Sequence, residues 1–346
     1  MQLHLNDRDQ AKWNALCATQ EKNDRVTRLL AHYLNEIPRF ISRRMVRDLA
    51  RKVGVPEENA YRTLFSAALG LDTVSSAEDR RLEKEYLSTG LRLLTPSDWN
   101  RDAYLQTVSF PAAKDGKWCF CTETYTPYEP FVCNSPCRTA DGKEIPQLGY
   151  FTETYRFPAV RENGVEWMAV KPNEISTMQE PIRAAHGNVV AFGLGLGYFA
   201  FHTSEKADVT SVTVVERDPA VIDLFGRFLL PQFPNREKIK IVQADAFDHA
   251  EHTLPQTDAD FAFVDLWHDQ SDGLPLYLRF RRLESLSPKT EFCYWIETTL
   301  LASLRRMVFD RIRDGGNGEI RSFSEIGTML SDGYLRNIAP KVKQMQ

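Results

Sequence analysis

Apolar residues recur every three or four positions through the N-terminal part of the chain, a period typical of helices that bury one face. One such stripe consists of Val26, Leu29, Leu30, Tyr33, Leu34 and Ile37. Pro38 follows it directly and should end that helix. Two further helices are predicted at 42–53 and 57–69, on either side of a Gly-Val-Pro break. We therefore predict a helical N-terminal domain over residues 1–106.

Between residues 107 and 172 the pattern changes to short aromatic and β-branched runs separated by turn residues. The clearest turn is Asn163-Gly164, which lies between the apolar runs 157–160 and 167–170. An Asn-Gly pair favours the two-residue turns that join antiparallel strands. We predict a small antiparallel β domain over residues 107–172.

After Pro172, strand-like apolar runs alternate with helical patterns. The runs occupy residues 189–192, 211–216, 239–243, 261–265 and 292–296. Four crossovers between five such runs predict a parallel sheet with helices on both faces. The expected class is α/β, a Rossmann-like, doubly wound, mostly parallel sheet of strand order 3-2-1-4-5 over residues 173–314.

The region beyond the last run departs from the usual closing hairpin of such a sheet. No strand pair follows Ile296, and a helix over 298–314 takes its place. The remaining segment, 315–346, is predicted to be a polar C-terminal tail with one helix near 322–330.

The first run of the predicted sheet leads into a glycine-rich turn, Gly193-Leu194-Gly195-Leu196-Gly197. Glycines permit a sharp turn and a close approach of a ligand to the backbone. The next run ends in Glu216, 19 residues after Gly197 (216 minus 197), where a ribose-binding carboxylate is expected. Asp245 and Asp265 end the following two runs. Carboxyl ends of parallel strands share one edge, so we predict a nucleoside-binding site there.

The spacing of the glycines narrows the class of ligand. A dinucleotide-binding turn needs a glycine where this chain has Tyr198. Three acids at successive strand ends suit a cationic sulfonium nucleoside better than a diphosphate. We therefore expect S-adenosyl-L-methionine, and not NAD, as the cofactor.

Three segments resemble motifs of the class I S-adenosylmethionine-dependent methyltransferases, and most closely their spermidine-synthase-like branch. These are Phe192–Gly197, Val215-Glu216-Arg217-Asp218-Pro219 and Gln243-Ala244-Asp245-Ala246-Phe247-Asp248. The resemblance implies a cofactor site made of Gly193, Gly195, Gly197, Glu216, Arg217, Asp245, Ala246 and Asp265. In that branch an acidic pair also opens the linking helix, here Asn173-Glu174.

Two departures from the spermidine synthases bear on the reaction. Leu196 stands near the place where those enzymes carry an Asp in the glycine turn. Their Asp-x-x-Asp-Pro signature is only partly matched by the segment 265–269. The predicted activity is therefore methyl transfer to an unidentified acceptor, with aminopropyl transfer as the alternative. Candidate general bases are Asp265, His268 and Asp269, which share the loop after the fourth run.

A second alternative is a nucleic-acid-binding protein with a nucleotide-sensing Rossmann domain. The helices at 42–53 and 57–69 have the spacing of a helix-turn-helix motif. Local basic residues are Arg39, Arg43, Arg44, Arg47, Arg51, Lys52 and Arg62. However, Glu57 and Glu58 open the second helix and would repel phosphates. We expect a solvated basic face and no nucleic-acid partner.

Four of the six cysteines, Cys119, Cys121, Cys133 and Cys137, lie close together in the sequence. Their C-x-C and C-x-x-x-C spacings are not the common zinc knuckle, so we predict thiols and no metal site. Hydrophobic residues make up 42% of the chain and charged residues 26%, with a net charge of -4. The sequence shows no signal-peptide core and no apolar run long enough to span a membrane, which favours a cytoplasmic protein. It leaves the oligomeric state open, with a homodimer among the states allowed.

Overall fold

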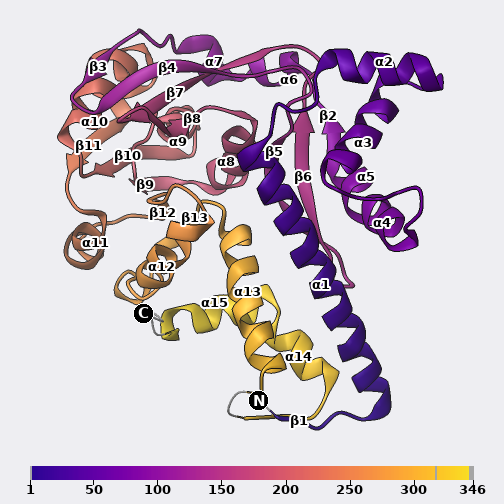
Figure 1. Ribbon diagram of the computed structural model, residues 1–346. Coiled ribbons are helices and arrows are strands. Elements are labelled where there is room, and N and C mark those ends of the chain that lie inside the picture. The colour runs from indigo at the N-terminus through magenta and orange to yellow at the C-terminus, as the bar shows by residue number, and fades with distance from the viewer. Residues whose placement is uncertain (1, 316–317, 343–346) are drawn as a thin grey trace. The chain divides into compact units, whose positions relative to one another are not determined.

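The computed structural model describes residues 2–315 and 318–342 and divides the chain into two compact units. The sheet unit comprises the described residues of Met1–Leu3, Asn100–Glu123 and Phe157–Gln346. The helical unit comprises His4–Trp99 and Thr124–Arg156. Strands β4 (Trp118–Tyr125) and β7 (Tyr155–Glu162) continue from one unit into the other (Figure 1). Neither unit is therefore a single stretch of sequence.

The helical unit is built mainly from the N-terminal helices and a three-stranded sheet of order β2-β6-β5. Its helices are α1 (Asp7–Glu36), α2 (Arg43–Val53), α3 (Glu57–Ala68), α4 (Ala77–Leu82) and α5 (Ser88–Gly90), with α6 (Pro96–Asn100) at the unit boundary. Its strands are β2 (Leu91–Leu93), β5 (Phe131–Arg138) and β6 (Glu144–Tyr150).

Local capping explains where the long helices begin and end. The side chain of Asn6 accepts a hydrogen bond from the backbone N–H of Asp9 and caps α1, and Ser42 caps α2 in the same way through Met45. Gly54 ends α2 in the left-handed conformation at φ 73°, which a residue with a Cβ rarely adopts. The predicted helical N-terminal region is confirmed.

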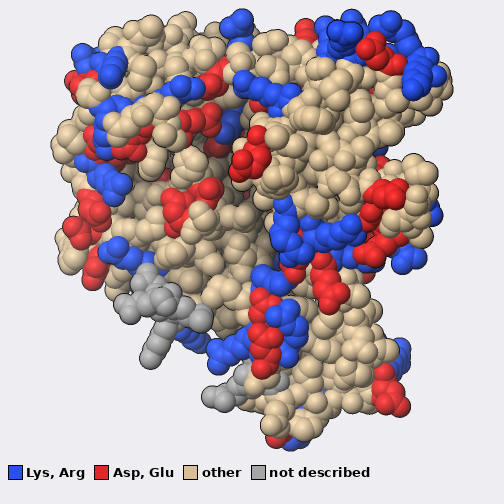
Figure 2. Space-filling model, in the orientation of Figure 1, with Lys and Arg blue, Asp and Glu red and all other residues tan. Residues whose placement is uncertain are grey.

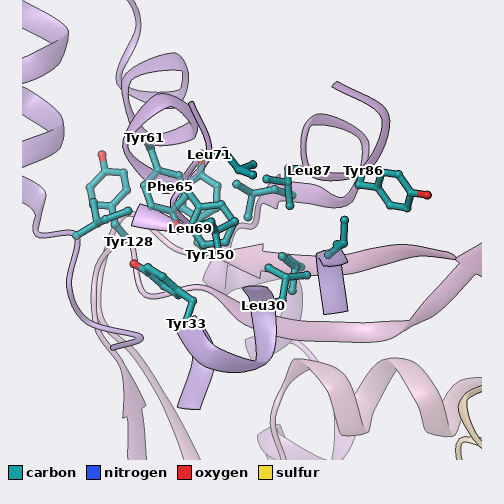
Figure 3. Packing of buried hydrophobic residues seen from close by; sticks show 14 of the residues in the cluster. Leu30, Tyr33, Tyr61, Phe65, Leu69, Leu71, Tyr86, Leu87, Tyr128 and Tyr150 are labelled. Carbon is teal, nitrogen blue, oxygen red and sulfur yellow. The ribbon is translucent and has the colours of Figure 1, made fainter. Parts of the chain in front are cut away.

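The core of the helical unit is an aromatic and aliphatic cluster shared by helices and strands (Figure 3). Tyr33 of α1 and Phe65 of α3 meet edge to face, with ring centroids 5.1 Å apart. The ring of Tyr61 in α3 lies 4.1 Å from that of Tyr150 in β6. Because β6 buries its apolar face against these helices, it belongs to the helical unit.

The sheet unit contains the remaining elements. Its helices are α7 (Ala103–Thr107), α8 (Pro172–Ala184), α9 (Tyr198–Ser204), α10 (Pro219–Leu224), α11 (Ala246–Asp248), α12 (Gln270–Phe280), α13 (Glu297–Arg313), α14 (Phe323–Met329) and α15 (Asp332–Ile338). Its strands, besides β4 and β7, are β1 (Gln2–Leu3), β3 (Lys114–Asp115), β8 (Val165–Ala169), β9 (Gly187–Phe192), β10 (Val209–Glu216), β11 (Ile239–Gln243), β12 (Phe261–Val264), β13 (Glu291–Tyr294) and β14 (Glu319–Ile320). Short π-helical and 3-10 turns extend several of these helices.

The centre of the sheet unit is a five-stranded sheet in the order β11-β10-β9-β12-β13. All neighbouring strands in it are parallel. Every residue of β12 is buried, whereas the edge strand β11 has none fully buried, as expected for a central and an edge strand. The prediction of a mixed α/β protein with a helical N-terminal region and a parallel sheet is confirmed.

The predicted hairpin is present, as β7 and β8. The two strands pair antiparallel, with Ala159 opposite Ala169. Asn163 and Gly164 both have positive φ, 50° and 87°, which is what the tight turn between such strands requires.

The strands between residues 107 and 172 form two sheets and not one, which corrects the expected single antiparallel domain. One is β3-β4-β7-β8, and the other is β2-β6-β5. In the second sheet β2, from the helical region, pairs parallel with β6. The physical reason is that β6 buries its apolar face against the helices. The expected domain boundaries after residues 106, 172 and 314 stay predictions.

The region after the parallel sheet is helical. α13 follows β13 where a closing hairpin is usual, as predicted from the sequence. The predicted tail helix near 322–330 is α14, and α15 is an additional helix. Residues 316–317 and 343–346 of the predicted tail lie outside the described residues. Within 2–315 and 318–342, no helix is both long and apolar enough to cross a membrane.

Candidate functional site

A cavity of about 600 Å³ lies in the sheet unit at the carboxyl ends of β9, β10, β11 and β12. Its floor is formed by the residues that directly follow these strands. Strands β4, β7 and β8 supply part of the wall, with Trp118, Glu162 and Met168 among the lining residues, and helical residues after β10 and β12 supply more. The cavity therefore joins the glycine turn to the strand-end acids.

The lining contains most of the predicted cofactor residues. These are Gly193, Gly195, Glu216, Arg217, Asp245, Ala246 and Asp265. Gly197 and the two candidate bases His268 and Asp269 are not part of the lining. Trp267 also lines the cavity, whereas Tyr198 and Phe199, which follow the glycine turn, do not.

The carboxylate of Glu216 is held by backbone N–H groups. Its Oε1 accepts hydrogen bonds from the N–H groups of Arg217 and Asp218, each at 2.8 Å. Its Oε2 accepts one from the N–H of Leu194 in the glycine turn at 3.3 Å. These bonds fix the carboxylate at the cavity wall while leaving lone pairs for a ligand.

Asp245 serves as a helix cap. Its Oδ1 accepts from the N–H groups of Phe247 and Asp248 at 2.9 and 3.2 Å, which begins α11. The side chain is exposed and lines the cavity, so capping leaves its other oxygen open to solvent.

Asp265 is the one candidate base that lines the cavity. Burial, and then the charge of Glu174, raise the pKa of Asp265 well above its ordinary value. The pKa of Glu174, in the first turn of α8, is itself raised to about 7, chiefly by burial. A raised pKa means that the carboxylate of Asp265 holds a proton more strongly than an exposed one does. The role of Asp265 as a general base stays a prediction.

His268 and Asp269 are not among the residues that line the cavity. Asp269 caps α12 by accepting from the N–H of Ser271 at 2.6 Å, and Asp272 completes the capping box. His268 is exposed, and its Nε2 lies 3.3 Å from the carbonyl oxygen of Glu166. The Asp269-x-x-Asp272 spacing is itself a capping signal, so the sequence already contained the reason for this placement.

At each of the three glycines of the turn, a side chain would clash with a different neighbouring residue. A Cβ at Gly193 would lie 2.0 Å from the backbone oxygen of Asp265, and one at Gly197 would lie 2.3 Å from the ring of Phe225. A Cβ at Gly195 would lie 2.1 Å from the sulfur of Met168. Gly193 and Gly197 are thus required by packing against Asp265 and Phe225, and Gly195 by packing against Met168.

Sequence reasoning missed the wall supplied by β4, β7 and β8. Trp118 donates from Nε1 to Asp218 Oδ2 at 3.0 Å, and Lys117 forms ion pairs with Glu162 and Asp218. All three strands lie well before the glycine turn in sequence. No local pattern signals that they line its cavity.

A buried polar network lies behind the glycine turn. Tyr104 of α7 donates its hydroxyl to the carbonyl of Leu196 at 2.5 Å. Tyr198 donates to Asp102 Oδ2 at 2.8 Å, and His202 Nε2 lies 3.3 Å from Asp102 Oδ1. The segment 102–104 therefore holds the glycine turn and the start of α9 together.

The basic face of α2 is interleaved with acids (Figure 2). Arg44 and Arg51 both pair with Asp48, at 3.5 and 3.8 Å. Arg47 pairs with Glu57 of α3 at 3.4 Å. These exposed pairs reduce the local positive potential that a phosphate backbone would need.

Among the described residues, no group of three or more His, Cys, Asp or Glu side chains is arranged to hold a metal ion. Cys119 and Cys121 lie in β4 and Cys133 and Cys137 in β5, all as free thiols. The absence of zinc stays a prediction.

No protein-family model matches the sequence, and no curated protein sequence matches it significantly. Solved structures with some similarity include a spermidine synthase from Thermotoga maritima, with 13% identity, a TM-score of 0.31, and coverage of 44% of this chain and 60% of that one. A spermidine synthase in complex with the transition state analogue AdoDATO gives 12% identity, a TM-score of 0.31, and coverage of 44% and 59%. MNMC2 from Aquifex aeolicus gives 13% identity, a TM-score of 0.29, and coverage of 50% and 63%. Each match spans less than two thirds of the other chain.

Proposed function

We propose that the sheet unit binds S-adenosylmethionine and that the protein is a methyltransferase acting on an unidentified acceptor. The observation that carries the proposal is the position of Glu216. Its carboxylate ends β10, lines the cavity and is tied to the glycine turn after β9. Counted from β9, the sheet has the order 3-2-1-4-5, in which ligands bind at the carboxyl edge where the strand order reverses.

The charges around the cavity favour a cation over a diphosphate. Two basic residues line it, Lys117 and Arg217. The acidic lining residues are Glu162, Glu216, Asp218, Asp245, Asp265 and Asp272. A negative potential of this kind attracts a sulfonium and repels the pyrophosphate of NAD.

Each part of the lining has a distinct role in this proposal. Glu216 accepts from the ribose hydroxyls, and Asp245 accepts from the adenine amino group. The bound sulfonium supplies an activated methyl group, so the chain's own residues need only position the two reactants and exclude water. Trp267 is 5% exposed and lines the cavity together with Asp265, which orients the acceptor.

Isothermal calorimetry with the purified full chain tests the proposal. S-adenosylmethionine and S-adenosylhomocysteine should bind and raise the melting temperature, whereas NAD should do neither. The variant His268→Ala, at a position outside the cavity lining, should bind as the wild type does. Binding of NAD without binding of either adenosyl compound would contradict the proposal.

A further inference from the structure

Met168 lies on the glycine turn from the opposite wall of the cavity. Its Sδ accepts a hydrogen bond from the backbone N–H of Leu196 at 3.2 Å. A Cβ at Gly195 would lie 2.1 Å from the same sulfur and 2.4 Å from its methyl carbon. Both Met168 and the turn line the cavity. The thioether thus contacts Gly195, one of the glycines of the turn that line the cavity, and the N–H of the next residue.

The thioether of Met168 forms only a weak hydrogen bond with the N–H of Leu196. Sulfur is a weak acceptor, and a carboxylate oxygen binds a backbone N–H far more strongly. The Met side chain has three rotatable bonds and adapts easily to a new environment. A ligand carrying a carboxylate can therefore replace Met168 at Leu196 with a gain in hydrogen-bond strength.

The backbone of Met168 is fixed, so a displacement would involve the side chain alone. Met168 pairs with Val160 across the β7–β8 hairpin, and the next residue, Ala169, is buried. Movement of the side chain would leave this pairing intact. The cavity can open at the turn without rearrangement of the sheet.

We propose that Met168 is an autoinhibitory gate of the cavity. In the unliganded protein its thioether holds the Leu196 N–H and fills the space beside Gly195, and an amino-acid carboxylate on the ligand displaces it. This inference rests on the proposed function, because S-adenosylmethionine carries such a carboxylate. The gate lowers the apparent affinity, since every binding event must first remove the thioether.

Calorimetry with S-adenosylhomocysteine on the full chain tests the gate. Met168→Ala removes both the sulfur acceptor and the bulk of the side chain. It should bind S-adenosylhomocysteine about three- to tenfold more tightly, because the ligand no longer has to displace one weak hydrogen bond. Met168→Leu keeps the bulk but loses the acceptor and should give a smaller gain. If Met168→Ala binds poorly and Met168→Leu binds well, the defect comes from the space that the Ala substitution leaves. Val165→Ala, in the same strand at a side chain that is 71% exposed, should leave the affinity unchanged.

A methionine methyl-labelled sample shows whether the ligand reaches Met168. The Met168 methyl resonance, assigned by its loss in Met168→Leu, should shift on addition of S-adenosylhomocysteine. Equal or weaker binding by Met168→Ala, with wild-type binding intact, would overturn the gate and leave the proposed function standing. Loss of binding in the wild type and all variants would instead contradict the proposed function, and the gate with it. Binding by Met168→Ala alone would support both.

Discussion

Glu216 accepts a hydrogen bond from the backbone N–H of Leu194 at 3.3 Å, so the carboxylate at the end of β10 is part of the glycine turn after β9. The sequence by itself predicts that Glu216 only binds ligand and that the fold does not depend on it. The structure changes that expectation, because the same carboxylate also satisfies the N–H groups of Arg217 and Asp218.

Glu216→Ala should therefore impair stability and binding together. Loss of the hydrogen bonds should lower the free energy of unfolding by about 1–3 kcal/mol. The affinity for S-adenosylhomocysteine should fall by about tenfold or more, because charge-assisted bonds to the ribose are lost. Denaturant titration and calorimetry on one preparation measure both.

Glu216→Gln is the matched control, since it keeps one acceptor oxygen and loses the charge. It should fall between the wild type and Glu216→Ala in both measurements. A drop in stability with unchanged affinity in both variants would show that Glu216 is structural only.

The network around Asp102 predicts an acid-sensitive contribution to stability. Burial raises the pKa of Asp102, but the hydrogen bond and charge of His202 and the hydroxyl of Tyr198 outweigh it and hold the pKa below its ordinary value of 3.8. A carboxyl whose pKa is lowered by folding stabilises the protein above its unfolded-state pKa. That contribution is lost as the pH falls through the folded-state pKa.

Asp102→Asn tests this network. An Asn side chain can still cap α7, but it has no charge to attract His202. The variant should be less stable than the wild type at neutral pH, and the difference should shrink as the pH falls below about 4. Unfolding curves measured from pH 3 to pH 7 give the comparison. A difference that is constant over this range would contradict the prediction.

Two buried tyrosines of the helical unit predict opposite responses to loss of a hydroxyl. Tyr61 is 0% exposed, and its hydroxyl has no hydrogen-bond partner within the described part of the chain (Figure 3). Tyr86 is also 0% exposed, but its hydroxyl donates to Asn23 Oδ1 at 2.9 Å. Burial of an unsatisfied hydroxyl costs free energy, whereas a buried hydrogen bond stabilises.

Tyr61→Phe should leave the free energy of unfolding unchanged or raise it. Tyr86→Phe should lower it by about 1–2 kcal/mol, because the Asn23 oxygen loses a donor. Thermal and denaturant unfolding of the two variants side by side measure the contrast. A larger loss in Tyr61→Phe than in Tyr86→Phe would show the assignment to be wrong.

The ion pairs on α2 predict that the full chain does not bind nucleic acid. With Arg44, Arg47 and Arg51 each paired to an acid, duplex DNA and RNA should give no mobility shift at moderate salt. The double variant Arg43→Glu/Arg47→Glu should behave as the wild type does. A shift that weakens with rising salt and disappears in the double variant would restore the helix-turn-helix alternative.

The elements that sequence patterns predicted well are those whose signals are local. The β7–β8 hairpin followed from Asn163-Gly164, which can adopt the positive φ angles of its turn. The central strand β12 followed from its unbroken apolar run, since a strand covered on both faces has no polar side to alternate with.

The features that the sequence did not predict depend on contacts between distant segments. Met168 and Trp118 meet the strand-end residues only after β4 and β8 have folded against the glycine turn. The placement of β6 with the helices likewise depends on a contact between distant residues, that of Tyr150 in β6 with Tyr61 in α3. Hydrophobic periodicity gives the period of a strand but not its partner.

The pairing of β1 with β14 has a consequence for synthesis of the chain. Gln2 lies opposite Glu319, so the two partners are separated by 317 residues (319 minus 2). A ribosome releases Gln2 long before Glu319 exists, and this contact cannot form while the nascent chain is shorter than that. The last residue of the helical unit, Arg156, is synthesised well before β14, whereas β1 of the sheet unit cannot pair until β14 has been synthesised.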